Sequence, residues 1–292
     1  MSASSPDRVR ASTIATIAVV AALAIAVIVV VSGGDDSTSS APRPSDPQRI
    51  AYGDGPSQYG VFSSPSGSTS DASPVVVLIH GGFWYDEYSR DLMDPLAVDL
   101  VERGFAVWNI EYRRVGEPGG GYPGTLADVA AAIDHLVVLD ADLDLGLDLD
   151  NVSVVGHSAG GHLALWAASR GALPPDAPGA NPAVVPRRAI GQGPVVDLVA
   201  GADGGLGAGA VVDFLGTPAD EPERYTIATP SGATTTQLAV VRAGDDVLVP
   251  ARFTEYADGA EVEVITVPDE DHFDLIDPAS ASWSAVISLL TR

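Results

Sequence analysis

The residues best suited to chemistry lie in the motif GHSAG, Gly156 to Gly160, with a serine at its centre. A G-x-S-x-G motif is typical of a sharp turn between a strand and a helix, which raises the serine hydroxyl above a sheet. The preceding run, Val152 to Val155, predicts a buried strand, and apolar residues at helical spacing follow Ser158. An ordinary glycine-serine turn is the simpler alternative. A predicted strand, the glycine-serine turn and a predicted helix follow one another directly, and this order favours Ser158 as a nucleophile.

A serine nucleophile needs a base to remove its proton and an acid to orient that base. His272, in the segment PDEDHFDLI after the last predicted strand, lies where the base is expected; the alternative is a surface histidine in an acidic loop. Asp245 and Asp246 both follow the preceding predicted strand, and these positions alone leave the choice of acid open. The other histidines lie in turns with backbone roles or on predicted helices: His80, His135, His157 and His162.

A second glycine-containing turn follows another predicted buried strand. The run VVVLIH ends in His80-Gly81-Gly82-Phe83-Trp84, and the two glycines allow the backbone to turn its amides towards a ligand. A strand-end turn without a ligand is the alternative, which the neighbouring serine motif disfavours. We therefore expect an oxyanion hole formed by the backbone N–H groups of Gly82, Phe83 and Ala159.

The order of elements predicts an α/β fold, with a mostly parallel central sheet and helices on both faces. An antiparallel hairpin is expected within residues 50–70, and a glycine-rich stretch, 201–216, predicts a small cap insertion. The acidic run 140–150 does not place glycine and glutamate as an EF-hand requires, so a solvated loop is expected there. Further strands are expected at 105–110, 189–192, 238–242 and 262–267, and helices at 91–103, 125–139, 251–257 and 278–290.

Composition excludes several classes of chemistry. The chain of 292 residues contains no cysteine, which excludes disulfides and thiolate catalysis. All 15 basic residues are arginines, which excludes lysine Schiff bases and a P-loop lysine. The net charge of −24 predicts repulsion from nucleic acid and from anionic lipid. No motif calls for a metal or a cofactor, and the partner expected is a small-molecule ester or amide.

The N-terminal part of the chain predicts a membrane segment. Residues 13–31 carry no charge over 19 positions, which is about 28 Å of helix, and arginines precede the segment while aspartates follow it. Residues 1–12 are then cytoplasmic, 32–49 form a flexible linker, and the domain 50–292 lies outside the cytoplasm. An uncleaved single-pass anchor is favoured over a cleaved signal peptide, which would give a secreted protein.

From about Tyr52 to Leu290, the sequence resembles the esterase/lipase-like branch of the α/β-hydrolase superfamily. That branch includes kynurenine formamidases and bacterial feruloyl- and acetyl-esterase relatives. The segments HGGFW, EYRR, GHSAGGHLALW, GQGPVVDL and DHFDLI carry the resemblance. The D-x-x-V-P pattern of this branch fits Asp246 to Pro250 and favours Asp246 as the acid. The His-Gly that often precedes the acid is replaced here by Arg242-Ala243.

The resemblance implies an α/β-hydrolase fold and a serine hydrolase. We expect hydrolysis of carboxylic esters through Ser158, Asp246 and His272, with an acyl-enzyme intermediate. An N-formyl amide substrate, as in kynurenine formamidases, is the alternative, although an extracytoplasmic domain argues against a catabolic substrate of the cytoplasm. An inactive, surface-tethered binding module is a further alternative, and the presence of all three catalytic residue types disfavours it. A peptidase is disfavoured because no gating domain accompanies the core.

Overall fold

The computed structural model describes residues 46–65, 73–256 and 260–292. The chain divides into two units, residues 1–40 and 41–292, and all described residues belong to the second unit. Both the predicted membrane segment, 13–31, and most of the predicted linker lie outside the described residues. Among the described helices, none combines the length and the apolar character needed to cross a membrane. The anchor and the extracytoplasmic location therefore stay predictions.

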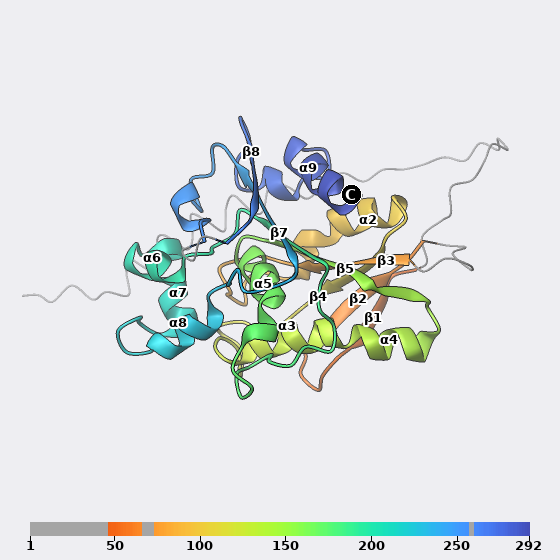
Figure 1. The fold of residues 1–292 in the computed structure, drawn as a ribbon, viewed down its shortest axis with the longest axis horizontal. Helices are drawn as coiled ribbons and strands as arrows, with labels where there is room; N and C mark the ends of the chain where they lie inside the picture. Colours follow the sequence, from red (N-terminus) through yellow and green to blue (C-terminus); the bar gives the residue numbers. More distant parts are fainter. Residues whose placement is uncertain (1–45, 66–72, 257–259) are drawn as a thin grey trace, which may run out of the picture. The chain divides into compact units, whose positions relative to one another are not determined.

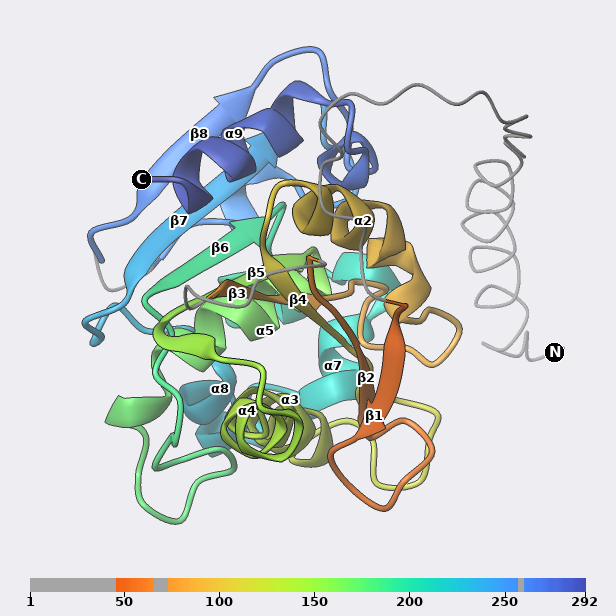
Figure 2. The same ribbon diagram turned by 90° about the vertical axis from the view of Figure 1, so that its right-hand side faces the viewer.

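The described residues form one eight-stranded sheet, with the strand order β1-β2-β4-β3-β5-β6-β7-β8 (Figure 2). The first two strands form the predicted antiparallel hairpin, and β2 also pairs antiparallel with β4. All remaining pairs are parallel, so the predicted mostly parallel sheet is confirmed. The strands are β1 Gln48–Ala51, β2 Tyr59–Ser63, β3 Ser73–Ile79, β4 Ala106–Ile110, β5 Leu147–His157, β6 Arg188–Gln192, β7 Gln237–Ala243 and β8 Glu263–Val267.

Helices cover both faces of this sheet (Figure 1). Successive side chains of a strand point to opposite faces, so a strand of apolar residues presents apolar side chains to the helices on each face. In β3, Val75, Val77 and Ile79 join the apolar cluster on the face of α3 and α5, whereas Val76 and Leu78 join the cluster on the face of α2 and α9. The helices are α2 Asp94–Glu102, α3 Gly124–Asp134, α4 Leu136–Leu143, α5 Ala159–Ala168, α6 Leu198–Asp203, α7 Ala210–Leu215, α8 Pro222–Ala228 and α9 Ala281–Leu290.

Two predicted segments differ from the structure. The acidic run 140–150 is not a loop throughout, because α4 continues to Leu143 and β5 already begins at Leu147. The Asp140 carboxylate accepts a hydrogen bond from the Leu147 amide at 2.8 Å, which closes the short turn between them. The predicted helix 251–257 is one 3-10 turn, Ala251–Phe253, because the Phe253 carbonyl accepts hydrogen bonds from residues 196 and 197 instead of continuing a helix.

The insertion between β6 and β7 contains the predicted cap. Its glycine-rich stretch, 201–216, forms the end of α6, a 3-10 turn, Leu206–Ala208, and α7, and α8 follows it. The ring of Phe214 in α7 stacks on Trp84 with centroids 5.0 Å apart and planes 5° apart. A Cβ atom at Gly207 would lie 2.5 Å from the Phe83 ring. The insertion therefore packs on the glycine turn that follows β3.

One buried ion pair ties α3 to the segment after α5, and it generates a stability prediction. Arg170 has a side chain 1% exposed and contacts the Asp134 carboxylate at 2.5 Å, while the same carboxylate accepts the amides of Ala183 and Val184 at 3.1 Å. We expect Asp134→Asn to lower the free energy of unfolding by about 3 kcal/mol, because it leaves a buried guanidinium without its counter-charge.

Denaturant unfolding measures this change. The matched control is Glu263→Gln, which removes the half-exposed partner of Arg292. That variant should cost less than about 1 kcal/mol, because exposed ion pairs contribute little. Equal losses in the two variants would contradict the role assigned to Asp134.

Candidate active site

Ser158 lies in the turn between β5 and α5, in a backbone conformation that few side chains adopt. Its φ is 56° and its ψ is −118°, and its amide donates a hydrogen bond to the Gln192 carbonyl at 2.8 Å. A Cβ atom at Gly156 would lie 2.0 Å from the Gly160 carbonyl oxygen, and one at Gly160 would lie 2.1 Å from the carbonyl oxygen of Ile79. Glycine is therefore required on both sides of this strained serine.

His272 and Asp246 meet beyond the carboxyl ends of β8 and β7. The His272 Nδ1 lies 2.6 Å from Asp246 Oδ2, and both side chains are at most 5% exposed. The other carboxylate oxygen, Asp246 Oδ1, accepts the amides of Leu248 and Val249 at 2.9 and 2.8 Å. Asp245 is exposed, and its amide donates to the Glu270 carbonyl. Of the two candidate acids, Asp246 is the one that contacts His272.

This pair lies beside the serine turn. Gly193, which directly follows β6, has a φ of 52°, and a Cβ atom there would lie 3.2 Å from both Asp246 Oδ2 and His272 Cε1. The residue before it, Gln192, accepts the amide hydrogen of Ser158. Ser158 and His272 are 2% and 4% exposed, so the structure brings the predicted nucleophile and base into one buried region at the carboxyl ends of the strands.

The glycine turn after β3 packs against the serine turn. A Cβ atom at Gly81 would lie 3.0 Å from the Ser158 Cβ. Positive φ angles follow at Gly82, Phe83 and Trp84. Within the described part of the chain, the amides of Gly82, Phe83 and Ala159 donate no hydrogen bond to another protein group. These three N–H groups, on either side of the serine, stay available to a ligand.

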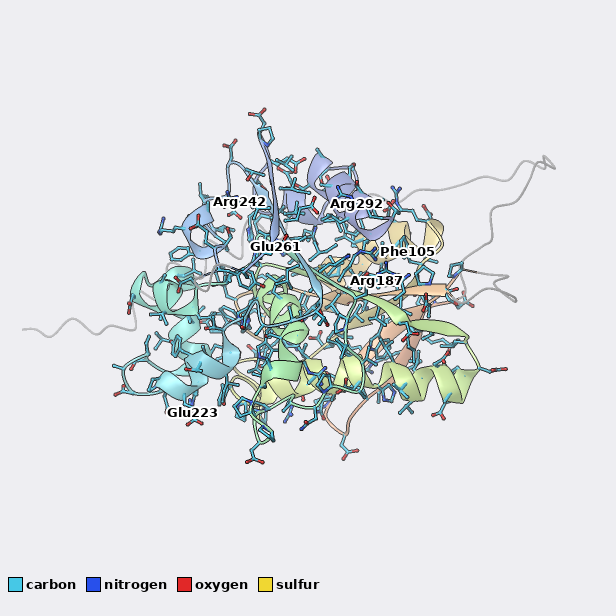
Figure 3. The ribbon with its side chains drawn as sticks, in the orientation of Figure 1. Phe105, Arg187, Glu223, Arg242, Glu261 and Arg292 are labelled. Carbon is cyan, nitrogen blue, oxygen red and sulfur yellow. The ribbon has the colours of Figure 1, made fainter. Side chains whose placement is uncertain are left out.

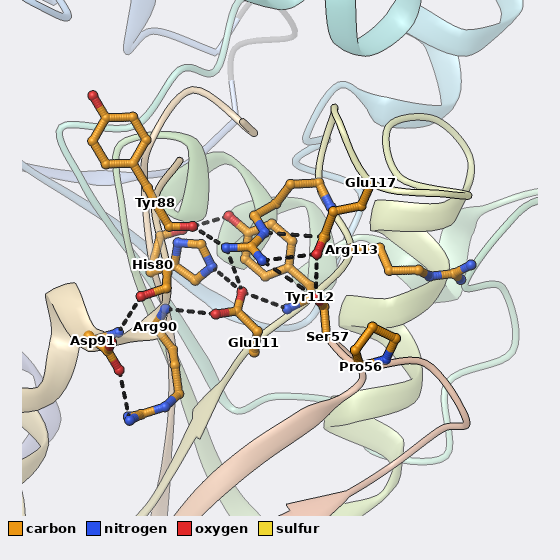
Figure 4. Close-up of polar contacts among 12 residues, drawn as sticks. Pro56, Ser57, His80, Tyr88, Arg90, Asp91, Glu111, Tyr112, Arg113 and Glu117 are labelled. Atoms are coloured by element: carbon orange, nitrogen blue, oxygen red, sulfur yellow. Dashed lines mark hydrogen bonds and ion pairs between the residues drawn. The ribbon is translucent and has the colours of Figure 1, made fainter. Parts of the chain in front are cut away.

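A buried carboxylate supports the glycine turn from below (Figure 4). Glu111 Oε1 lies 2.8 Å from His80 Nε2 and 3.2 Å from the guanidinium of Arg114, and its other oxygen accepts the Arg90 amide at 3.0 Å. Burial acts to raise the pKa of Glu111, but the hydrogen bond from His80 and the charge of Arg114 lower it below its usual range. The carboxylate is therefore ionised and paired.

The same network holds the first residue of the turn in place. His80 Nδ1 lies 2.7 Å from the Gly81 carbonyl oxygen, and the His80 carbonyl accepts the Tyr112 hydroxyl at 2.8 Å. The His80 and Tyr112 rings stack with centroids 4.4 Å apart. Glu111 was not predicted as a site residue from the sequence. The signal available was a glutamate that directly follows a buried strand, in the segment EYRR.

His162, in the first turn of α5, connects the glycine turn to the cap. Its Nδ1 accepts the Trp84 indole N–H at 3.3 Å, and its Nε2 donates to the Ala228 carbonyl at 2.8 Å. Since Nδ1 accepts and Nε2 donates, the ring is neutral in this arrangement. Burial lowers the pKa of His162 to about 4, against the smaller effect of the Ala228 carbonyl, which raises it.

A separate cavity of about 700 Å³ lies at the opposite, amino ends of β6 to β8. Figure 3 labels three of its lining residues, Arg187, Glu261 and Arg292. Its charged lining residues include Arg187, Arg188, Glu261, Glu263 and Arg292, and none of Ser158, Asp246 and His272 contributes to it. Since Arg292 is paired with Glu263, much of this charge is balanced locally. The cavity is distinct from the candidate active site.

Known proteins resemble this chain in both sequence and fold. Residues 62–174 match the family BD-FAE. The sequence is 31% identical to esterase LipQ of Mycobacterium tuberculosis over 121 residues, which is 41% of this chain and 28% of that protein. Esterase B from Lactobacillus rhamnosis, at 19% identity, has the same fold, with a TM-score of 0.76 over 99% of this chain and 95% of that chain. The chain is thus similar to an esterase in part of its sequence and has the fold of another esterase.

Two further proteins are similar to this chain. The chain is 27% identical to kynurenine formamidase of Drosophila melanogaster over 114 residues, which is 39% of this chain and 35% of that protein. A truncated carbohydrate esterase from gut microbiota matches it with a TM-score of 0.71 at 18% identity, over 86% of this chain and 98% of that chain. The chain spans about a third or less of the length of these two curated relatives.

The burial of neutral His162 predicts a stability that depends on pH. An unfolded histidine binds its proton near pH 6.5, whereas folded His162 does so near pH 4, so the unfolded state binds more protons between these values. The protein therefore becomes less stable as the pH is lowered through this window. We expect wild type to lose about 2 kcal/mol more than His162→Gln between pH 7 and pH 5, measured by denaturant unfolding.

The matched control for this measurement is His135→Gln, which removes a half-buried histidine between α3 and α4. Burial lowers the pKa of His135 as well, but this ring is only partly buried, so its removal should change the pH dependence less than His162→Gln does. Parallel stability curves for wild type and His162→Gln between pH 7 and pH 5 would contradict the assignment of a buried neutral ring.

Proposed function

We propose that this protein is a carboxylesterase that uses Ser158 as nucleophile, His272 as general base and Asp246 as the orienting acid. The observation that carries the proposal is the strained Ser158 turn beside the buried His272–Asp246 pair. The sequence similarity to esterase LipQ supports ester hydrolysis as the reaction. The substrate is a small-molecule carboxylic ester, and the chemistry calls for no metal and no cofactor.

The hydrogen bond between His272 and Asp246 determines the tautomer of the imidazole. Because the carboxylate accepts at Nδ1, the ring proton lies there and the Nε2 lone pair is left to take the proton of Ser158. The serine oxygen then attacks the ester carbonyl carbon. The imidazolium gives its proton to the leaving alkoxide oxygen, which departs as an alcohol and leaves an acyl-enzyme. Water, deprotonated by the same base, attacks the acyl group and releases the carboxylic acid and free Ser158.

The negative charge of the tetrahedral intermediate is stabilised by the N–H groups of Gly82, Phe83 and Ala159. These donors are backbone groups with no other partner among the described residues, so they need no rearrangement when charge develops. Ala159 begins α5, and the positive end of the helix dipole adds to the stabilisation. The ionised Glu111 holds the glycine turn through His80 and keeps the first two donors in place.

An N-formyl amide is the second candidate substrate class. The observation that favours it is the similarity to kynurenine formamidase of Drosophila melanogaster. The same nucleophile and oxyanion hole would act, with the amine nitrogen taking the proton of the imidazolium. A panel of short-chain aryl esters and an N-formyl aryl amide, compared by kcat/KM, separates the two candidates.

Fluorophosphonate labelling of the full chain tests the nucleophile. We expect one adduct, on Ser158, located by peptide mass mapping, and no adduct in Ser158→Ala. Ester turnover should fall by about a thousandfold or more in His272→Ala and in Asp246→Asn, because each removes one member of a unit that acts together. The matched control is Asp245→Asn, whose exposed carboxylate does not contact His272, and its turnover should stay near the parent value. A folded protein without any adduct would refute the proposal.

Gly193 provides a test of the geometry. Adding a methyl group there would place an atom 2.8 Å from the Leu275 side chain and 3.2 Å from both Asp246 and His272, in a backbone conformation that disfavours alanine. We expect Gly193→Ala to lower kcat by about tenfold or more, since small displacements of catalytic groups are costly. Gly171→Ala is the control, because its Cβ would meet no atom within 4 Å. Parent-like kcat in a folded Gly193→Ala would contradict this geometry.

A further inference from the structure

His157, the second residue of the GHSAG motif, makes a contact that the proposed mechanism does not use. It ends β5 and is 3% exposed. Its Nε2 lies 3.0 Å from the backbone carbonyl oxygen of His272, although the two residues are 115 positions apart in the chain. The centroids of the two imidazole rings are 4.5 Å apart. One side chain of the nucleophile motif thus contacts the backbone of the proposed base.

The partners of His157 define its protonation state. A carbonyl oxygen only accepts, so Nε2 must carry the proton and donate it to His272. The pKa of His157 is well below its usual range, first because the ring is buried and then because of the charge on His272; the hydrogen bond to the His272 carbonyl acts in the opposite direction. Its Nδ1 has no hydrogen-bond partner within the described residues and faces Gly81, where a Cβ atom would lie 2.9 Å away.

Other contacts hold the segment around His272, but not at the same point. The Asp245 amide donates to the Glu270 carbonyl at 2.9 Å, and the Gln192 side chain donates to the Leu275 carbonyl. These bonds fix the segment two residues before and three residues after His272. The bond from His157 holds the carbonyl of His272 itself, and with it the point from which the imidazole projects.

We propose that His157 is a positioning residue, whose neutral Nε2–H holds the backbone of His272 beside Ser158. The proposal rests on the proposed serine hydrolase function. A neutral donor suits this place because His272 becomes positively charged during turnover, and a charged neighbour at this separation would repel it. A second cation would favour unprotonated His272 and work against the proton transfer from Ser158.

Two substitutions in the full chain test the proposal. His157→Leu keeps an apolar side chain but has no donor, and we expect kcat for an aryl ester to fall by about 10- to 100-fold while KM changes little. His157→Gln offers an amide N–H to the same carbonyl and should recover most of the lost kcat. His135→Leu and His135→Gln are the matched controls at a histidine outside the site, and both should keep parent kcat. Parent-like kcat in folded His157→Leu, or equal losses in the leucine and glutamine variants, would overturn the proposal.

A measurement on the wild-type chain keeps the proposal testable if His157→Leu does not fold. Long-range ¹H–¹⁵N NMR spectra report which imidazole nitrogen carries the proton. We expect His157 to be neutral with its proton on Nε2 at pH 7 and still neutral at pH 5.5. A proton on Nδ1, or a doubly protonated ring at pH 7, would overturn the proposal. Absence of both turnover and Ser158 labelling in wild type would instead refute the proposed function, whatever the spectra show.

Discussion

The close approach of two backbone turns is the constraint on which the rest of the site depends. The turn at Ser158 touches the end of β3, and a single added carbon at Gly160 would lie 2.1 Å from the Ile79 carbonyl oxygen. The glycine turn that follows β3 lies against Ser158 in the same way, through Gly81. Because protein interiors do not compress, this contact leaves few positions for the serine oxygen relative to the backbone amides. A strained serine is the consequence.

Burial then imposes pairing on the polar groups around this contact. The Glu111 carboxylate lies among His80, Arg114 and backbone amides, and Asp246 lies among His272 and two further amides. A buried charge without such partners would be strongly destabilising. The whole chain carries a net charge of −24, and the two buried carboxylates near the site are each paired with a histidine and with backbone amides. The acidity of this chain is therefore a property of its surface, separate from the chemistry proposed for its interior.

The five histidines show how far environment determines the use of one residue type. Two of them, His157 and His162, are buried rings whose pKa is lowered mainly by burial, and each donates through Nε2 to a carbonyl. His272 differs because a carboxylate faces its Nδ1, which leaves Nε2 for a proton from outside. We infer that the neutral histidines hold backbone segments around the site, while the one paired with an aspartate transfers the proton.

Much of the fold followed from local pattern, since buried strands, helical spacing and glycine turns are short-range features of the chain. Residues such as Val152 to Val155 and the motif GHSAG predicted the sheet and its central turn correctly. The structures of the acidic run 140–150 and of residues 251–257 were not predicted correctly. The Asp140 side chain and the Phe253 carbonyl accept hydrogen bonds from partners that the local sequence does not specify.

The same limit applied to the candidate site. The sequence by itself determined which serine, histidine and aspartates could do chemistry, since only a few residue types can and each stood at a strand end. Tertiary structure decided that Asp246 rather than Asp245 contacts His272, that Glu111 lies under the glycine turn, and that His157 contacts the backbone of His272. These contacts join residues brought together by the pairing of distant strands, and no short stretch of sequence carries that information.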